Sequence, residues 1–449
     1  MNKIIYPTLD LFLYYQRDSL TENEADIKTN HANFWSNLPK NLKVELAEEE
    51  KAENTDYVRL LEFSEVAKRQ KQFFFTASLG GYPIEASYYP IRLNDTYALL
   101  YDCYINEKIQ PQPISCLIYL KTLANYKSAN LGTTWIISGY LSPSSNPEVI
   151  AQELYKEFTG KEWQNPLEGK FLGATVFEIW QSPQKWKDVE KENHHVLIFL
   201  YPTLQTMEKT ASFYKLWLQL FCYRNKIIFA YSESQKYNQK LHNLVTEIVN
   251  LNHKIENIPA QKDSEKSKEL QKIFQSHPKI SFDYLTKLNQ LKILQQSISN
   301  NLANYKFIIK KIKEQTQILA EKDILIGETN LKFLEDFTRV IEQNYQFQIA
   351  KNYTNYSLMT KILESQVNII QGMINLDKKE SDRTLTNTII IASSGLAAST
   401  ITASIISTKL PSPTAKNKPI SVEQAFGLSA GIGLFVVAIA YVILRLFRK

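Results

Sequence analysis

Helix-breaking residues are missing from long parts of this 449-residue chain. No glycine lies between Gly173 and Gly327, and no proline lies from Lys279 through Leu410. Glycine and proline are the residues that most often end a helix, and these stretches are rich in Leu, Ile, Lys, Gln and Glu. Their absence excludes a C-terminal half built from short strands and tight turns, and it predicts long helices instead.

Metal-ligand and disulfide patterns are missing as well. The three cysteines, Cys103, Cys116 and Cys222, are odd in number and widely spaced, so they match neither a disulfide framework nor a zinc site. His194 and His195 open a predicted strand, in which neighbouring side chains point to opposite faces, so the pair is poorly placed to bind one metal. We expect no metal site, no cofactor and a reducing, cytosolic setting for most of the chain.

Motifs for catalysis and for nucleotide binding do not occur either. Gly80-Gly81 stands alone, without the GxGxxG or GxxxxGK[ST] pattern that cradles phosphate groups. No nucleophile can be paired with a base by spacing, so we expect a protein that is not an enzyme and has no catalytic residues. With 52 basic and 46 acidic residues, the net charge of +6 is too small a surplus to indicate a nucleic-acid partner.

The first half of the chain, residues 1–230, alternates strand-like and helix-like patterns, which predicts a mixed α/β or α+β cytosolic domain. One helix is expected from the N-cap Asn146, with Pro147 at its first position, to a C-cap at Gly160. Another helix is expected over residues 207–224. Segments rich in Tyr, Phe, Ile and Val are expected to be strands, namely residues 57–63, 73–77, 97–105, 114–120, 135–141, 174–180 and 196–201.

Aromatic side chains cluster in this half of the chain, for example in Phe73-Phe74-Phe75 and Tyr88-Tyr89. Clusters of this kind either fill a hydrophobic core or mark a surface that binds a partner protein. Core packing is the interpretation that we favour, and a protein partner of this domain is the alternative.

Residues 231–384 have apolar residues at alternating steps of three and four, the spacing of coiled-coil helices. Residues 231–280 are expected to be a coiled-coil helix that ends at Pro259, followed by a charged stretch. That stretch, residues 261–269, is either a linker or the solvated face of a helix.

Residues 281–384 are expected to form an antiparallel helical stalk that turns near Gly327. The second arm of this stalk is expected to continue straight into the apolar run that follows, because no proline interrupts it. Polar residues at Gln348, Asn352 and Asn355 interrupt its heptad register. The apolar members of that register are Leu331, Leu334, Ile341, Tyr345, Met359, Ile362, Ile369, Met373 and Leu376.

Two apolar runs near the C-terminus contain no Asp, Glu, Lys or Arg. Residues 385–408 and 425–444 are 24 and 20 residues long, and each suffices to cross a hydrocarbon core about 30 Å thick. We expect an integral membrane protein in which these two transmembrane helices lie in the lipid bilayer, joined by the loop 409–424 and followed by the basic tail 445–449. Six basic residues flank the hairpin and three lie in its loop, which favours both termini in the cytoplasm.

The first expected span carries small and hydroxylated side chains on one helix face. Such a face either packs closely against other membrane helices or lines a water-filled pore when several copies assemble, and both interpretations remain open. In the second span, Gly427 and Gly431 form a GxxxG pattern that favours helix packing. The residues of the first face are Thr386, Ser393, Ala397, Thr400, Ser404 and Ser407.

The order of these parts resembles the CorA-type magnesium transporters, with a cytosolic α/β domain, a long helix that runs into the first of two C-terminal spans, and a basic tail. The resemblance covers the whole chain as an order of parts, and it implies a homo-oligomer, such as a pentamer, with the first span facing its axis. That family ends its first span with Gly-Met-Asn, whereas this span ends Ile405-Ile-Ser-Thr-Lys-Leu-Pro. The following loop has Glu423 as its one carboxylate. Magnesium selectivity is therefore not implied, and no functional residue is transferred.

Two functions are expected as alternatives. The first is an ion-conducting pore or transporter that the cytosolic domain gates through the stalk. The second is a non-conducting module, anchored in the membrane, whose N-terminal domain binds a protein or another signal at the membrane surface.

Overall fold

The computed structural model of the chain describes residues 2–18, 24–38, 58–60, 73–127, 129–181, 186, 189, 193–257, 263–323 and 326–376. These residues belong to two compact units. The first unit is formed by residues 1–233 and 296–347, and the second by residues 234–295 and the chain from residue 348. Both predicted spans lie outside the described residues.

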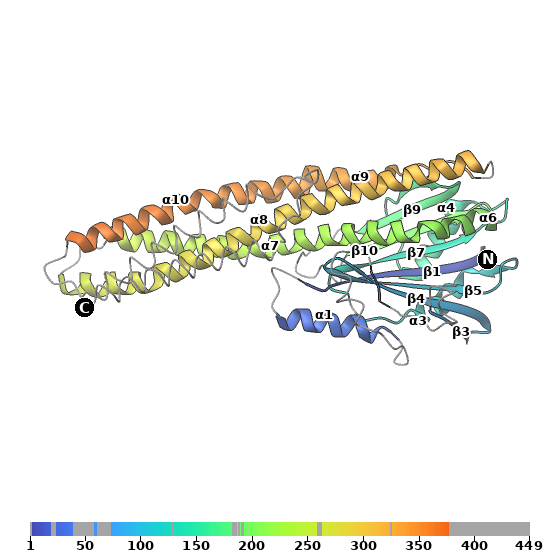
Figure 1. Cartoon of the computed structure of the whole chain (residues 1–449), viewed down its shortest axis with the longest axis horizontal. Helices are drawn as coiled ribbons and strands as arrows, with labels where there is room; N and C mark the ends of the chain where they lie inside the picture. Colours follow the sequence, from blue (N-terminus) through green and yellow to red (C-terminus); the bar gives the residue numbers. More distant parts are fainter. Residues whose placement is uncertain are drawn as a thin grey trace. The chain divides into compact units, whose positions relative to one another are not determined.

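A ten-stranded sheet forms the larger part of the first unit (Figure 1). Its main path runs β2-β4-β5-β1-β7-β10-β9-β8, with β3 paired to β4 and β6 paired to β1. Neighbouring strands are antiparallel except β7 and β10, which are parallel. The strands are β1 (Lys3–Gln16), β2 (Val58–Arg59), β3 (Phe73–Leu79), β4 (Tyr82–Leu93), β5 (Thr96–Ile105), β6 (Pro111–Pro113), β7 (Gly132–Tyr140), β8 (Leu167–Phe171), β9 (Ala174–Gln181) and β10 (His194–Tyr201).

The central strand β1 was not among the expected strands. Its residues Leu9, Leu11 and Leu13 face one side of the sheet, and Asp10 and Phe12 face the other, as the period of two requires. Both neighbours, β5 and β7, pair with it over most of its length. Nearly all of its side chains are therefore buried on one face or the other, and the strand reads as an almost continuous apolar run.

Helices cover both faces of the sheet. One face packs on three helices around the main hydrophobic core. The other face lies under α7, where the rings of Phe12 and Phe221 have centroids 5.2 Å apart and the Tyr14 hydroxyl donates a hydrogen bond of 2.8 Å to the Leu218 carbonyl. The covering helices are α1 (Glu24–Ser36), α3 (Leu117–Leu123), α4 (Pro147–Thr159) and α7 (Tyr214–Asn257).

Helix α4 confirms its sequence prediction. Asn146 is the N-cap and accepts hydrogen bonds from the backbone N–H groups of Glu148 and Val149, and Pro147 occupies the first helical position. Gly160 ends the helix in the left-handed conformation, with φ +71°.

The strand predicted over residues 114–120 is wrong, because this segment is helical. A 3-10 turn, Ile114–Cys116, leads directly into α3. Leu117 and Leu120 are both fully buried and lie three residues apart, which is the spacing of a helix face and not of a strand. Short apolar runs of this kind carry too little periodicity to separate the two structures.

Long helices follow the sheet in the sequence. The helix predicted over residues 207–224 is divided between α6, a 3-10 turn and α7. Helix α7 continues without a break through residue 230, where the first domain was predicted to end. From Asp263 on, the charged stretch after Pro259 belongs to α8, which begins before the predicted stalk and continues through Pro278. The turn predicted near Gly327 is confirmed between α8 and α9. These helices are α6 (Leu204–Lys209), α8 (Asp263–Lys322), α9 (Lys332–Val340) and α10 (Phe347–Leu376).

In the second unit, polar side chains join the packed helices at intervals. The Tyr284 hydroxyl of α8 donates to the Tyr356 carbonyl of α10 at 2.6 Å, and the Tyr356 hydroxyl donates to the Asn238 carbonyl of α7 at 3.1 Å. Further along, His277 Nε2 and Gln366 Oε1 lie 3.0 Å apart, and both side chains are buried. These pairs fix the register of the helices, because each buried polar atom needs its partner.

A π-helical segment, Ile341–Gln346, joins α9 to α10, and beyond it one of the two heptad rows is displaced by one residue. The uninterrupted heptad from Ile341 passes through residues 348, 355, 362 and 369, but Ile362 and Ile369 are exposed. The buried residues are Ile349 and Leu363, one position later. A π-helix accommodates one extra residue in a turn, so the predicted row that contains Ile341 is wrong beyond this segment. The row that contains Tyr345 is kept, because Gln366, three heptads later, is still buried.

Two neighbouring substitutions test this shift. We expect Ile349→Ala to lower the free energy of unfolding by about 2–5 kcal/mol, because it empties a fully buried site. Gln348→Ala, at the position that the uninterrupted heptad would bury, is expected to cost less than about 1 kcal/mol. Chemical unfolding of the purified protein followed by circular dichroism measures both, and a larger loss for Gln348→Ala would restore the unshifted register.

Candidate functional site

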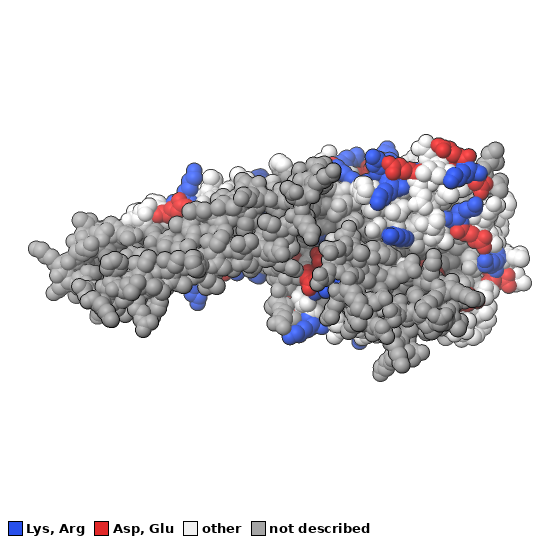
Figure 2. All heavy atoms as spheres, viewed as in Figure 1, with Lys and Arg blue, Asp and Glu red and all other residues white. Residues whose placement is uncertain are grey.

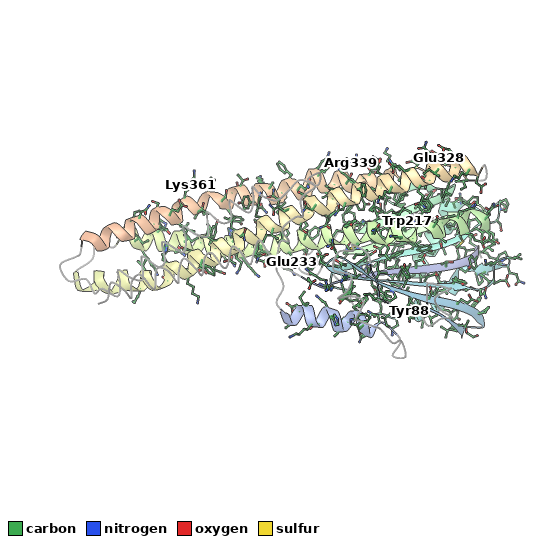
Figure 3. All side chains as sticks on the ribbon, in the orientation of Figure 1. Tyr88, Trp217, Glu233, Glu328, Arg339 and Lys361 are labelled. Carbon is green, nitrogen blue, oxygen red and sulfur yellow. The ribbon has the colours of Figure 1, made fainter. Side chains whose placement is uncertain are left out.

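The connection between α8 and α9 lies against the turn between β8 and β9, and both belong to the first unit. Residues 170–173 and 327–330, which we call the turn contact, form an antiparallel bridge between Lys170 and Asn330. Glu328, labelled in Figure 3, belongs to this connection. The hydrogen bonds run from Lys170 N to Asn330 O (3.0 Å), from Asn330 N to Lys170 O (2.7 Å), from Leu172 N to Thr329 Oγ1 (3.0 Å) and from Gly173 N to Glu328 O (2.9 Å).

Two glycines make the turn contact possible, because their backbones touch. Gly173 adopts φ +87°, which L side chains rarely take, and a Cβ atom on Gly327 would lie 2.6 Å from the Gly173 Cα. Gly169 adds a third close approach, since its Cβ would meet the Phe333 ring at 2.3 Å. Gly173 and Gly327 are also the residues that bound the long glycine-free stretch of the sequence.

A buried polar network lies nearby, on the face of the sheet that α7 covers. His195 of β10 is 2.8 Å from Glu178 of β9 through its Nε2 atom, and its Nδ1 atom is 3.0 Å from the Thr134 hydroxyl of β7. All three side chains are at most 2% exposed. His194 is exposed on the opposite face, so the prediction that the two histidines diverge is confirmed.

Arg224 of α7 covers this network on the side of the helices. Its Nη2 atom donates to Glu178 Oε1 at 3.4 Å, and its guanidinium carbon lies 4.6 Å from the Trp180 ring centroid and 4.2 Å from that of Phe337 on α9. The Nε and Nη1 atoms are buried without a hydrogen-bond partner among the described residues. Arg224 is thus held by one carboxylate and two aromatic faces, which stabilise a desolvated cation.

The charge states follow from these contacts. Burial disfavours ionisation of Glu178, but the hydrogen bond from His195 and the charge of Arg224 outweigh it and hold the pKa of Glu178 below its ordinary value. Burial, reinforced by the charge of Arg224, lowers the pKa of His195 to about 4. His195 is therefore neutral at pH 7, with its Nε2–H donating to Glu178 and its Nδ1 accepting from Thr134.

The order Thr134–His195–Glu178 is that of a hydroxyl, an imidazole and a carboxylate in a nucleophilic triad. A nucleophile must be reached by its substrate, but Thr134 is fully buried and also accepts a hydrogen bond from Asn225 at 3.4 Å. We therefore interpret this arrangement as structural: it holds the strands β7, β9 and β10 to helices α7 and α9.

A pair of titratable carboxyl groups lies on the same face of the sheet as this network. Asp10 of β1 and Asp102 of β5 are directly opposite in register, and the Tyr214 hydroxyl of α7 donates to Asp10 Oδ2 at 2.9 Å. Burial, followed by the charge of Asp102, raises the pKa of Asp10 well above its ordinary value. Burial also raises the pKa of Asp102 to about 6, although hydrogen bonds with Asp10 and Ser87 oppose the rise. The two groups share one proton at neutral pH.

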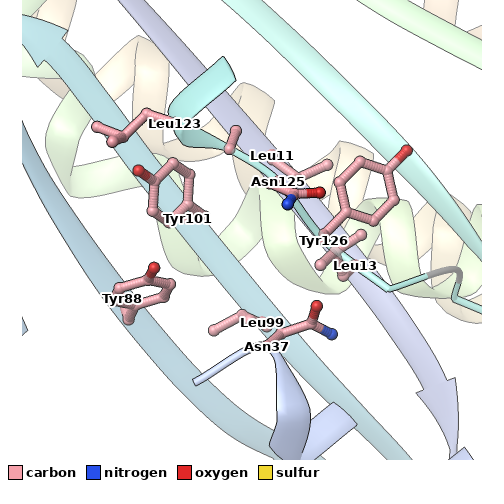
Figure 4. A pocket seen from close by; sticks show the side chains of 10 residues that line it. Leu11, Leu13, Asn37, Tyr88, Leu99, Tyr101, Leu123, Asn125 and Tyr126 are labelled. Carbon is pink, nitrogen blue, oxygen red and sulfur yellow. The ribbon is translucent and has the colours of Figure 1, made fainter. Parts of the chain in front are cut away.

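A shallow pocket lies on the other face of the sheet (Figure 4). The rings of Tyr88 and Tyr101 line it with centroids 4.9 Å apart, and Asn37, Asn125 and Tyr126 complete its polar rim. Sites for small-molecule ligands are typically about 300–1,000 Å³. The enclosed space of this pocket is only about 10 Å³, which holds about one water molecule and no metabolite.

Charges of both signs are spread over the surface of the first unit. On the face drawn in Figure 2, basic and acidic side chains are interspersed without a patch of one sign. Pairs such as Lys108 with Glu208, at 2.8 Å, and Lys209 with Asp323, at 3.2 Å, link them. Within the part of the chain that the structure describes, no group of three or more His, Cys, Asp or Glu residues is arranged to hold a metal.

The sequence-predicted site residues cannot be compared with this geometry. Thr386, Ser393, Ala397, Thr400, Ser404, Ser407, Gly427 and Gly431 all lie outside the described residues. Among the helices that are described, none combines the length and the hydropathy that a membrane crossing needs. The network residues were not predicted, although Glu178 and His195 stood out as polar residues within otherwise apolar strands.

Comparisons with known proteins add little to the geometry. No family model and no curated protein matches the chain. Among solved structures, it is similar to the complete structure of the CorA magnesium transporter from Methanocaldococcus jannaschii, with 12% sequence identity over 72% of this chain and 92% of that chain. The TM-score is 0.16, so the similarity is distant and carries no argument about function.

Removing one charge of the buried pair is expected to destabilise the first unit strongly. Glu178→Gln keeps a hydrogen-bond acceptor but leaves Arg224 buried without a counter-charge, at a cost of about 3–5 kcal/mol in the free energy of unfolding. The double variant Glu178→Gln, Arg224→Met removes both charges and is expected to recover most of this loss. Chemical denaturation measures both, and equal losses in the two variants would contradict the charge argument.

The two titrating groups are expected to act on stability in opposite directions. Asp102 holds its proton in the folded protein up to about pH 6 but loses it near pH 4 when unfolded, so its contribution falls as pH rises through this window. His195 binds its proton only near pH 4 when folded but near pH 6.5 when unfolded, so its contribution rises with pH.

Unfolding at several pH values tests these signs. The difference in stability between wild type and Asp102→Asn is expected to decrease from about pH 4 to 6. The difference between wild type and His195→Gln is expected to increase from about pH 4 to 6.5. Slopes of the same sign would show that one of the two assignments is wrong.

Proposed function

We propose that this protein is an integral membrane homo-oligomer whose sheet is coupled by long helices to a two-span hairpin, and that the hairpin conducts ions. The turn contact carries this proposal. It fastens the connection between α8 and α9 to the sheet through four hydrogen bonds and two touching glycine backbones. A change in the sheet is thereby passed to the helices of the first unit instead of being absorbed by a loose linker.

The buried network supports the same coupling from a second position. Arg224 contacts Trp180 on the sheet and Phe337 on α9 at once, and Phe337 in turn contacts Tyr305 of α8, with ring centroids 5.2 Å apart. Sliding α9 over the sheet would uncover the cation, which is costly in a desolvated site. The helices therefore follow the sheet as one body within this unit.

The sequence of the spans supports conduction. Thr386, Ser393, Thr400 and Ser407 recur every seven residues, so one face of the first span is lined with hydroxyl groups. Hydroxyl groups can replace part of the hydration of an ion in a pore that several copies enclose. The hairpin lies in the lipid bilayer in this proposal, with both termini in the cytoplasm, and the protein has no enzymatic activity.

The second candidate is a non-conducting anchored module that binds a protein at the membrane surface. The shallow pocket lined by Tyr88 and Tyr101 favours it, because the phenol groups can provide both packing area and hydrogen bonds to a partner that lies over it.

Ion flux from liposomes that contain the purified full-length protein separates the two candidates. Thr400→Leu is expected to reduce the flux severalfold, since it narrows and dries the hydroxyl-lined face. Thr402→Leu is the matched control, because it makes the same change two residues away on another face of the helix and is expected to leave the flux unchanged. Absence of flux from liposomes with verified insertion, or equal effects of the two variants, would favour the anchored module.

A second variant tests, in the same flux assay, whether the turn contact couples the sheet to the hairpin. Gly327→Ala places a methyl group against the Gly173 backbone and is expected to alter the flux. Gly81→Ala is the control, because nothing lies within 4 Å of its Cβ position, so the change adds only the strain of its positive φ and is expected to leave the flux unchanged.

A further inference from the structure

A cluster of tyrosine and charged side chains lies at the end of the sheet where β1 begins and β5 ends (Figure 1). The rings of Tyr6 and Tyr104 have centroids 5.2 Å apart, and Lys108 Nζ lies 5.4 Å from the Tyr6 ring centroid. Neither the turn contact nor the buried network uses these residues. What we call the Tyr6 cluster consists of Tyr6, Glu85, Tyr104, Lys108 and Glu208.

Tyr6 is held in a strained backbone conformation. Its φ is +51°, in the left-handed region that bulky residues rarely adopt, and the register of β1 on β7 shifts between Ile5 and Thr8. A bulge of this kind re-aims the side chain at the irregular position, and the Thr8 hydroxyl donates a 3.3 Å hydrogen bond to the Tyr6 carbonyl there. Backbone strain concentrates at functional sites, so the Tyr6 ring is a candidate binding surface.

Carboxyl groups surround this ring. The neighbouring Tyr104 hydroxyl donates to Glu85 Oε2 at 2.5 Å. Burial raises the pKa of Tyr6 to about 12, and nearby carboxyl groups add to the rise, namely those of Asp102, Glu85 and Glu208. The phenol is therefore neutral at pH 7, and an aromatic face beside carboxylates attracts a cation.

The cation at this place is the chain's own Lys108. Its Nζ atom donates to Glu208 Oε1 at 2.8 Å while it lies over the Tyr6 ring. The side chains of Lys108 and Glu208 are 47% and 55% exposed, and ion pairs that water reaches to this extent contribute little to stability. A cation from another molecule can therefore replace this ammonium group at little cost.

Hydrogen bonds hold the backbone around Lys108 in place, so that only its side chain has to move. The Lys108 carbonyl accepts a hydrogen bond from the Tyr140 hydroxyl, and Glu107 Oε1 accepts one of 3.1 Å from the backbone N–H of Ile109. The Ile109 side chain, next to Lys108 in this connection between β5 and β6, is 78% exposed. A partner can gain an apolar contact there without ordering a loose loop.

We propose that the Tyr6 cluster binds an arginine side chain of a partner protein, with the guanidinium group on the Tyr6 ring in place of Lys108. Arginine suits the cluster better than lysine, because a planar guanidinium group can stack on an aromatic ring and donate to a carboxylate at once. The charges are complementary, since the carboxylates of Glu85 and Glu208 face one ammonium group. Binding here does not depend on whether the hairpin conducts ions.

Saturation-transfer NMR on the purified full-length protein tests the site, with N-acetyl-arginine amide as the probe. Lys108→Met empties the site and is expected to raise the affinity for the probe roughly threefold or more over wild type. Lys310→Met is the matched control, because it removes the same charge from another exposed ion pair and is expected to leave the affinity unchanged. No gain for Lys108→Met, or equal gains in the two variants, would overturn the proposal.

The requirement for the Tyr6 ring is tested in the Lys108→Met background. Adding Tyr6→Phe keeps the aromatic face and is expected to retain the gain in affinity, whereas adding Tyr6→Leu is expected to abolish it. N-acetyl-citrulline amide, which has a similar shape but no charge, is expected to bind more weakly than the arginine probe. A gain that survives Tyr6→Leu, or equal binding of the two probes, would contradict a cation held on this ring. If Tyr6→Leu fails to fold by circular dichroism, the comparison of Lys108→Met with Lys310→Met still decides.

Discussion

The contact between Gly173 and Gly327 is the constraint on which the first unit depends. Two backbones can approach this closely only where neither residue has a Cβ atom, so neither glycine can be replaced without disturbing the contact. The contact joins the end of the sheet to the start of α9, which are far apart in the sequence. It also explains why the long glycine-free stretch is bounded by these two residues. The helices between them need no glycine, and the turns at both ends cannot dispense with it.

The buried charges add directionality to this contact. A hydrophobic interface between α7, α9 and the sheet would be stable in several registers, because apolar packing is not directional. Arg224 permits only the arrangement in which Glu178 meets its guanidinium group and Trp180 and Phe337 cover its faces. The cost of burying a cation therefore selects one register. Buried polar groups that fix a single arrangement at some expense of stability act in the same way in coiled coils.

Local signals in the sequence predicted the local features of the fold. Asn146, Pro147 and Gly160 predicted α4 because capping depends on neighbouring residues only. The segment at 114–120 was assigned to the wrong structure because its few apolar residues fit both periods. The network could not be predicted, since Glu178, His195 and Arg224 meet only after three elements have packed. The register shift at Ile341–Gln346 was equally out of reach, because no residue type marks a π-helix.

That π-helix also determines what α10 can do. Without the extra residue, Ile362 and Ile369 would lie on the buried side of α10. With the extra residue, Ile349 and Leu363 are buried in the chain's own bundle, and Ile362 and Ile369 are exposed. One inserted residue thus decides which apolar side chains of α10 the bundle buries and which it leaves exposed.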